Sequence, residues 1–260
     1  SDFYPIVPMD DNRWCKCSAC QSKLDPNRTG VFSSGEASNY IWGFINAVAQ
    51  KIASAYPDKY VVGLAYHQHA FWPDEINLAS NVAVQFCFWN YRGWHIDDLS
   101  EPEQDFYEDW VANEPNMPKF VRLYFMNPPA TANNFNYEPF PFYFSHNAID
   151  YMNMLNADNV DAVWMAHNGE LEYPLTYDLP EQYITLRMAE NPDVNGNQMF
   201  DEFFTLYYGN AAESMQELYE SLESRYTNTA NYPSGWLNSS NVNVRLAEGI
   251  SWEYLGTSSF

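Results

Sequence analysis

The chain has 260 residues, of which 46% are hydrophobic and 18% aromatic, so it can bury a sizeable core and is not a disordered polypeptide. Its 34 acidic residues outnumber its 12 basic ones, for a formal net charge of −22. That balance argues against nucleic acid and anionic membranes as partners, because both are bound through Lys and Arg. No apolar run reaches the roughly 18 residues that would span a bilayer, so membrane insertion is not expected. We interpret the acidic surface as an adaptation to a saline or extracellular setting, and we expect a secreted protein.

Strands and helices are predicted to alternate along the chain. Short runs rich in β-branched and aromatic residues predict strands over residues 3–9, 60–66, 81–89, 120–126 and 160–167. Apolar residues at helical spacing, clearest at Ile41, Phe44 and Ile45, accompany helices predicted over residues 35–56, 101–113, 146–156, 180–190 and 197–226. Residues 227–260 are rich in Asn, Ser and Tyr and show no periodicity.

This alternation predicts an α/β fold with a parallel sheet, because neighbouring parallel strands need long crossover connections. A closed (β/α)8 TIM barrel needs eight strands, and the sequence offers five. We therefore expect the C-terminal five strands of a (β/α)8 barrel over residues 1–190, a C-terminal helical segment over 191–226 and an irregular tail over 227–260. The three missing units would lie upstream in a longer polypeptide, so association with an upstream fragment or a homo-oligomer is expected.

Three of the four cysteines lie within six residues, as C-x-C-x-x-C at Cys15, Cys17 and Cys20, and the fourth is Cys87. Four thiolates would suit a tetrahedral zinc ion. The same residues could instead form disulfide bonds, which a secreted protein favours. Both alternatives are structural roles, and the spacing leaves both open.

Two carboxylates, Asp10 and Asp11, follow the first predicted strand. In an α/β barrel the carboxyl ends of the strands carry the catalytic groups. Paired carboxylates can divide acid and base chemistry, or hold the acetamido nitrogen of a sugar substrate. The alternative is that one aspartate caps a turn and the other is solvated.

Rings and histidines follow three of the predicted strands, where sugar-binding residues would be expected. They are Tyr66, His67, His69, Phe71 and Trp72, then Trp89, Tyr91, Trp94 and His95, and finally His167 with Glu170. Aromatic rings present apolar faces to the C–H groups of sugars, so these residues predict a saccharide cleft. Core packing explains many of them equally well, and the His-x-His pair could alternatively bind a metal. Two N-glycosylation sequons begin at Asn27 and Asn238, as expected of a secreted glycoprotein.

Several blocks of the sequence resemble a large bacterial family catalogued as domain of unknown function 4838, which includes glycoside hydrolase family 163. These blocks are "DDNRWCKCSACQ", "FINAVAQKIASAYPDKYVVGLAY", "PFPFYF", "NVDAVWMA" and "DEFFTLYYGNAAESM". The resemblance covers roughly residues 4–225. It implies a (β/α)8 barrel whose N-terminal half is absent here, and an activity similar to retaining endo-β-N-acetylglucosaminidases that act on N-glycans. Asp10 matches the family's aspartate, and all four cysteines match family cysteines.

The chain departs from the family pattern where carboxylates are expected. Met165, Ala166 and His167 replace a typical F-E-Q-G, and Asp11 replaces a glycine. We therefore expect either a glycoside hydrolase of N-acetylhexosamine-containing glycans, or a catalytically inactive relative that binds glycans or has a structural role. Asp10, Asp11 and Glu170 are the candidate catalytic residues. The candidate sugar-binding residues are Tyr66, His67, His69, Trp72, Trp89, Trp94 and His167. A glycan or glycoprotein is the expected partner, and no cofactor is required. Cys15, Cys17, Cys20 and Cys87 would either hold a structural zinc ion or form disulfide bonds.

Overall fold

The computed structural model describes residues 2–9, 11–30, 33–88, 97–126, 143–167, 179–235 and 250–258. The chain forms two compact units, which we describe separately. The first comprises Ser1–Trp89, Glu101–Leu123 and Asn159–Trp164, and the second comprises Asn90–Ser100, Tyr124–Asp158 and Met165–Phe260.

The predicted parallel sheet is present. Its strands are β1 (Phe3–Pro5), β2 (Tyr60–Ala65), β3 (Val82–Phe88), β4 (Lys119–Met126) and β5 (Ala162–His167). They are ordered β1-β2-β3-β4-β5; β1 to β4 pair in parallel, and β5 is the neighbour of β4. An α/β sheet whose spatial order follows the chain order is compatible with part of a (β/α)8 barrel.

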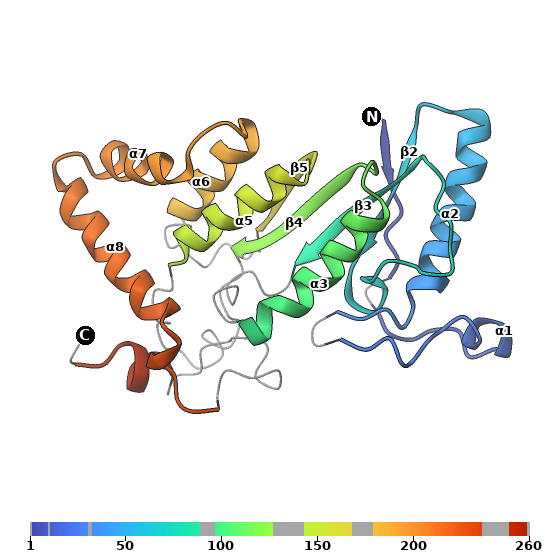
Figure 1. Cartoon of the computed structure of the whole chain (residues 1–260), viewed down its shortest axis with the longest axis horizontal. Coiled ribbons are helices and arrows are strands. Elements are labelled where there is room, and N and C mark those ends of the chain that lie inside the picture. The colour runs from blue at the N-terminus through green and yellow to red at the C-terminus, as the bar shows by residue number, and fades with distance from the viewer. Residues whose placement is uncertain are drawn as a thin grey trace. The chain divides into compact units, whose positions relative to one another are not determined.

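The five predicted helices are present, one of them as two separate helices, and the short helix α1 and the helical turns after residue 227 were not predicted. They are α1 (Ser18–Gln21), α2 (Ser38–Ala55), α3 (Asp97–Asn113), α5 (Ser145–Ala157), α6 (Leu179–Glu190), α7 (Gly196–Tyr208) and α8 (Ala212–Thr227) (Figure 1). Short helical turns occur at η1 (His67–His69), η3 (Gly209–Ala211), η4 (Thr229–Asn231) and η6 (Ile250–Leu255). The single helix predicted over residues 197–226 was wrong: Gly209, with a φ of 55°, separates α7 from α8. Glycine has no Cβ, so it adopts this left-handed conformation at no steric cost.

Helices of the first unit cover one face of the sheet. Because side chains alternate along a strand, Val61, Gly63 and Ala65 share one face of β2. Trp42 and Ile45 of α2 occupy the space where a side chain at Gly63 would lie. Phe86 of β3 packs edge-on against Tyr107 and Trp110 of α3. This face is therefore the dry core of the unit.

The opposite face of the sheet carries a second aromatic cluster. Phe3 of β1 stacks on Tyr60 of β2 at 5.1 Å between ring centroids, and meets Phe120 of β4 edge-on at 5.0 Å. Next along β4, the guanidinium of Arg122 lies 4.2 Å from the ring centroid of Trp164 on β5. Rings from three strands thus meet across this face, which links the strands through side chains as well as through their backbone hydrogen bonds.

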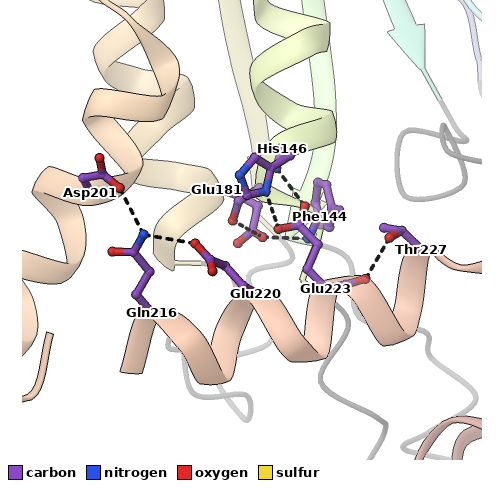
Figure 2. Close-up of polar contacts among 9 residues, drawn as sticks. Phe144, His146, Glu181, Asp201, Gln216, Glu220, Glu223 and Thr227 are labelled. Atoms are coloured by element: carbon purple, nitrogen blue, oxygen red, sulfur yellow. Dashed lines mark hydrogen bonds and ion pairs between the residues drawn. The ribbon is translucent and has the colours of Figure 1, made fainter. Parts of the chain in front are cut away.

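The second unit is held together around a buried carboxylate. Glu181 of α6 is fully buried, and its Oε1 accepts hydrogen bonds at 2.9 Å from the backbone N–H of Phe144 and from Ser145 Oγ (Figure 2). These groups lie at the N-terminal end of α5, where backbone N–H groups have no partner within their own helix. A side chain of α6 therefore caps α5, a contact that no local sequence pattern would reveal.

Candidate functional site

The loops that leave β1 and β2 line one hollow in the first unit. β1 and β2 are parallel neighbours, so both loops start at the same edge of the sheet. The empty space at the hollow, open solvent included, is about 190 Å³. Its lining residues are Met9, Asp11, Asn12, Trp14, Tyr66, His67, Gln68 and His69. Four of the candidate site residues from the sequence, Asp11, Tyr66, His67 and His69, therefore line the same hollow.

The backbone after β2 is held in an unusual shape beside the hollow. His67 has a φ of 51°, a left-handed conformation that is uncommon for a residue with a Cβ. Its carbonyl oxygen accepts a hydrogen bond from the N–H of Ser34 at 2.8 Å, and the carbonyl of Gln68 accepts one from the N–H of Ala37 at 2.7 Å. These two bonds from the segment before α2 hold the turn, and strained backbone of this kind clusters at functional sites.

Asp11 is held as an ionised acceptor. The backbone N–H of Arg13 donates to Asp11 Oδ1 at 2.8 Å, and the Arg13 guanidinium pairs with Oδ2. This hydrogen bonding to Arg13 lowers the pKa of Asp11 below its ordinary value. A carboxylate kept charged in this way suits hydrogen-bond acceptance or base chemistry, and is poorly suited to donating a proton.

Trp14 and Gln68, which the sequence analysis did not assign, join the two loops. The indole N–H of Trp14 donates to Gln68 Oε1 at 2.6 Å, and Gln68 Nε2 donates to Glu36 Oε2 at 2.7 Å. The Trp14 ring also packs edge-on against Tyr40 of α2, with centroids 6.0 Å apart. Their position inside the "DDNRWCKC" and "HQH" motifs is a signal that could have identified them.

The predicted sugar-binding rings have different environments. Tyr66 and His67 are partly exposed at the hollow, with ring centroids 5.8 Å apart. His69 is 4% exposed and meets Tyr66 edge-on, so it is chiefly a core residue. Trp72 does not line the hollow: its indole N–H points to Glu114 Oε1 at 3.4 Å, and its carbonyl accepts from Arg28 at 2.6 Å.

The cysteines of the C-x-C-x-x-C motif form a cluster next to the hollow. The Sγ atoms of Cys15, Cys17 and Cys20 all lie within 4.8 Å of one another, with Cys15 and Cys17 3.5 Å apart. Hydrogen bonding from the backbone N–H of Cys20 lowers the pKa of Cys17 below its usual range. These three thiols could hold a metal ion, and in the described part of the chain no other group of His, Cys, Asp or Glu is gathered closely enough to do so. Within the described residues, neither His67 nor His69 belongs to a group of three or more such ligands.

Cys87 does not join this cluster. It is fully buried near the C-terminal end of β3, whereas Cys15 and Cys17 are exposed. No disulfide bond joins any of the four cysteines. The prediction of Cys87 as a fourth ligand fails because it is held within the sheet, where β3 pairs with both of its neighbours.

Several predicted site residues lie outside the described residues: Asp10, Trp89, Trp94, Glu170 and Asn238. The backbone of His167 ends β5, but its side chain is likewise outside the description. Asn27, the other predicted glycosylation site, is exposed in a turn where its backbone N–H donates to Asp25. No helix in the described residues is both long enough and apolar enough to cross a membrane.

Comparison with known sequences returns one family. The sequence model described as "Domain of unknown function (DUF4838)" matches residues 1–220. Neither the curated proteins nor the solved structures contain a significant match to the chain.

Proposed function

The chain belongs to the family described as Domain of unknown function (DUF4838), and on that premise we propose that it is a glycoside-hydrolase-like protein of (β/α)8 ancestry. In this proposal it binds N-acetylhexosamine-containing glycans at the hollow beside β1 and β2. The observation that carries the proposal is the meeting of a charged acceptor, Asp11, with the rings of Trp14, Tyr66 and His67 around one hollow.

The chemistry of these groups suits a sugar. Aromatic rings offer apolar faces to sugar C–H groups, while an ionised carboxylate accepts hydrogen bonds from hydroxyl or acetamido N–H groups. The empty space of about 190 Å³ at the hollow includes open solvent, so a bound sugar residue would lie at the surface and stay partly in contact with water. A second residue of a bound glycan would extend beyond the hollow.

For hydrolysis, Asp11 would orient an acetamido group that attacks the anomeric carbon, because its lowered pKa keeps it charged. Proton donation to the leaving group needs a second carboxyl group, and the candidates from the sequence are Asp10 and Glu170. The competing function is a catalytically inactive relative that binds glycans or has a structural role. The absence of the family's usual strand-end glutamates from the sequence favours this alternative.

The setting we propose is extracellular, with a glycan or glycoprotein as the partner, and the net charge of −22 supports it. Sugar binding at the hollow needs no cofactor. We also propose that the thiols of Cys15, Cys17 and Cys20 hold a structural zinc ion, because three clustered thiolates are typical zinc ligands.

Isothermal titration calorimetry of the full chain with chitobiose tests the proposal. We expect Asp11→Asn to weaken binding about tenfold or more, because hydrogen bonds to charged acceptors are the strong ones. Asp193→Asn changes an exposed aspartate of the second unit in the same way and should leave the affinity unchanged. A folded wild-type chain without measurable chitobiose binding would remove the glycan proposal.

A hydrolysis assay distinguishes an active glycoside hydrolase from an inactive glycan-binding relative. Release of sugar from N-glycans, lost in Asp10→Asn, would identify a hydrolase. Chitobiose binding without release by the same protein would identify the inactive glycan-binding relative.

A further inference from the structure

The segment of residues 11–21 carries both Asp11 and Trp14 of the hollow and the three clustered cysteines. Of the described residues between β1 and α1, none belongs to a helix or strand. The four-residue helix α1 that follows has no buried residue. Apolar burial therefore contributes little to holding this segment in place.

We propose that a soft divalent cation, Zn²⁺, bound by the thiolates of Cys15, Cys17 and Cys20, fixes residues 11–21 and thereby holds Asp11 and Trp14 at the hollow. Metal binding would then control sugar binding. The sugar part of this inference rests on the proposed function, whereas the metal part rests on the cysteine geometry alone.

The three sulfur atoms are already close to the arrangement that zinc requires. Zinc–sulfur bonds are about 2.3 Å long, so thiolates around a tetrahedral zinc ion lie about 3.8 Å apart. Here the Cys15 and Cys17 sulfurs are 3.5 Å apart, and all three lie within 4.8 Å of one another. Shifts of an ångström or less would complete the site, and exposed side chains can make them.

The described residues supply no fourth His, Cys, Asp or Glu ligand to this cluster. We assign the fourth position to water, an arrangement that zinc otherwise adopts in catalytic sites with three protein ligands. The hydroxyl of Tyr40 donates to Cys20 Sγ at 3.5 Å. A hydrogen bond of this kind orients a metal-bound thiolate and moderates its charge.

Direct contacts link the cluster to the hollow. Trp14 precedes Cys15 in the chain, and its ring packs against the same Tyr40 that contacts Cys20. Gln21, at the end of α1, donates to the carbonyl of Cys15 at 2.6 Å and so closes the cysteine loop on itself. A metal ion that ties Cys15 to Cys20 would therefore restrain Trp14 through both its backbone and its ring.

Metal analysis and limited proteolysis test the inference without any sugar. We expect one zinc per chain in native protein, and Co²⁺ substitution should give the near-ultraviolet absorption of thiolate-to-cobalt charge transfer. Cys17→Ser should abolish that absorption, whereas Ser18→Ala, a change at the adjacent exposed residue, should preserve it. Less than about 0.2 zinc per chain, with no cobalt absorption, would overturn the inference because structural zinc sites bind tightly.

Trypsin reports on the segment itself, because Arg13, Lys16 and Lys23 are exposed cleavage sites in and next to it. Zinc should slow cleavage after these residues roughly tenfold or more relative to chelator-treated protein, since a ligand that binds only the ordered segment suppresses its opening. Cleavage after Lys51, on the exposed face of α2, should be unchanged. Equal cleavage of the segment with and without bound zinc would contradict the inference.

Chitobiose affinity, measured with and without zinc, tests the control of the hollow. We expect binding to weaken about tenfold on chelation, and to weaken equally in Cys17→Ser, because Trp14 is no longer held. Protection from trypsin with an unchanged sugar affinity would overturn the coupling to the hollow. If neither form binds sugar, the proposed function fails, and the cleavage experiment alone decides whether the metal fixes the segment.

Discussion

Glu223 of α8 binds two groups of one residue, His146, in the first turn of α5 (Figure 2). Its Oε1 accepts from the backbone N–H of His146 at 2.8 Å, and its Oε2 lies 2.8 Å from the ring Nδ1. Hydrogen bonding to Glu223 raises the pKa of His146 above its ordinary value, and the nearby charges of Glu220 and Asp150 act in the same direction. The ring is 51% exposed, so solvent weakens this ion pair.

The raised pKa predicts a pH-dependent contribution to stability. A group whose pKa is higher in the folded state stabilises the fold fully below its unfolded pKa of about 6.5, and the contribution disappears as the pH rises through the folded value. We expect His146→Gln to lower the free energy of unfolding at about pH 5.5, by less than about 1 kcal/mol, and to have a smaller effect at about pH 8.5. Urea unfolding of both proteins at the two pH values measures this difference. If His146→Gln lowered the free energy of unfolding more at the higher pH, the pair of His146 and Glu223 would not stabilise the fold in this way.

Between α2 and the sheet, the packing leaves no space for an additional methyl group at Gly63. A Cβ placed there would lie 2.5 Å from Trp42 Cζ3 and 2.7 Å from Ile45 Cδ1. Both neighbours are fully buried, so neither can move aside into solvent. A Cβ added at Gly43, on α2 itself, would have its nearest neighbour at 3.5 Å, which is an ordinary contact distance.

These two glycines predict opposite effects of the same substitution. Gly63→Ala should lower the free energy of unfolding by about 1–3 kcal/mol, because it overpacks the interface of α2 with β2. Gly43→Ala should raise it by up to about 1 kcal/mol, because alanine is the better residue in a helix interior. Urea unfolding curves of the two variants and the wild type make the comparison. Similar shifts in the two variants would argue against close packing between this helix and the sheet.

The molecule as a whole carries a large excess of negative charge. With 34 acidic and 12 basic residues, at least 22 carboxylates have no basic residue to pair with one to one. Some of the cations are already engaged in ion pairs with aspartates, as Lys59 is with both Asp2 and Asp58. Unpaired like charges repel one another in the compact state, and this repulsion lowers its stability.

Salt should therefore stabilise the protein. The Debye length falls from about 30 Å at about 0.01 M salt to about 3 Å at about 1 M, so added salt screens repulsion between surface carboxylates. We expect the midpoint of thermal unfolding to rise over this range, and to rise equally in sodium and potassium chloride because screening does not depend on the cation. Circular dichroism measures the midpoint. A constant or falling midpoint would mean that charge repulsion does not limit stability.

The sequence by itself determined the strands, most helices and the family, because each of these depends on local features. Residue periodicity marked the strands from β2 to β5, and α2 begins and ends within a few residues of its predicted limits. The same local view missed the break between α7 and α8, although Gly209 in "YYGN" was its visible signal. Capping of α5 by Glu181 could not be predicted, because 37 residues separate Glu181 from Phe144.

Only the tertiary structure decided which residues form the candidate site. Periodicity indicates the face of an element on which a side chain lies, but it does not indicate which loops meet at the end of a sheet. Trp14 and Gln68 are 54 residues apart and come together because β1 and β2 pair in parallel, while Trp72, only four residues further along, bonds to Glu114 instead. From the sequence, Cys87 was a candidate metal ligand like Cys15, Cys17 and Cys20. In the structure it is buried in β3 and is not part of their cluster. Distances between residues far apart in the chain depend on strand register and on the path of the loops, which local residue patterns do not encode.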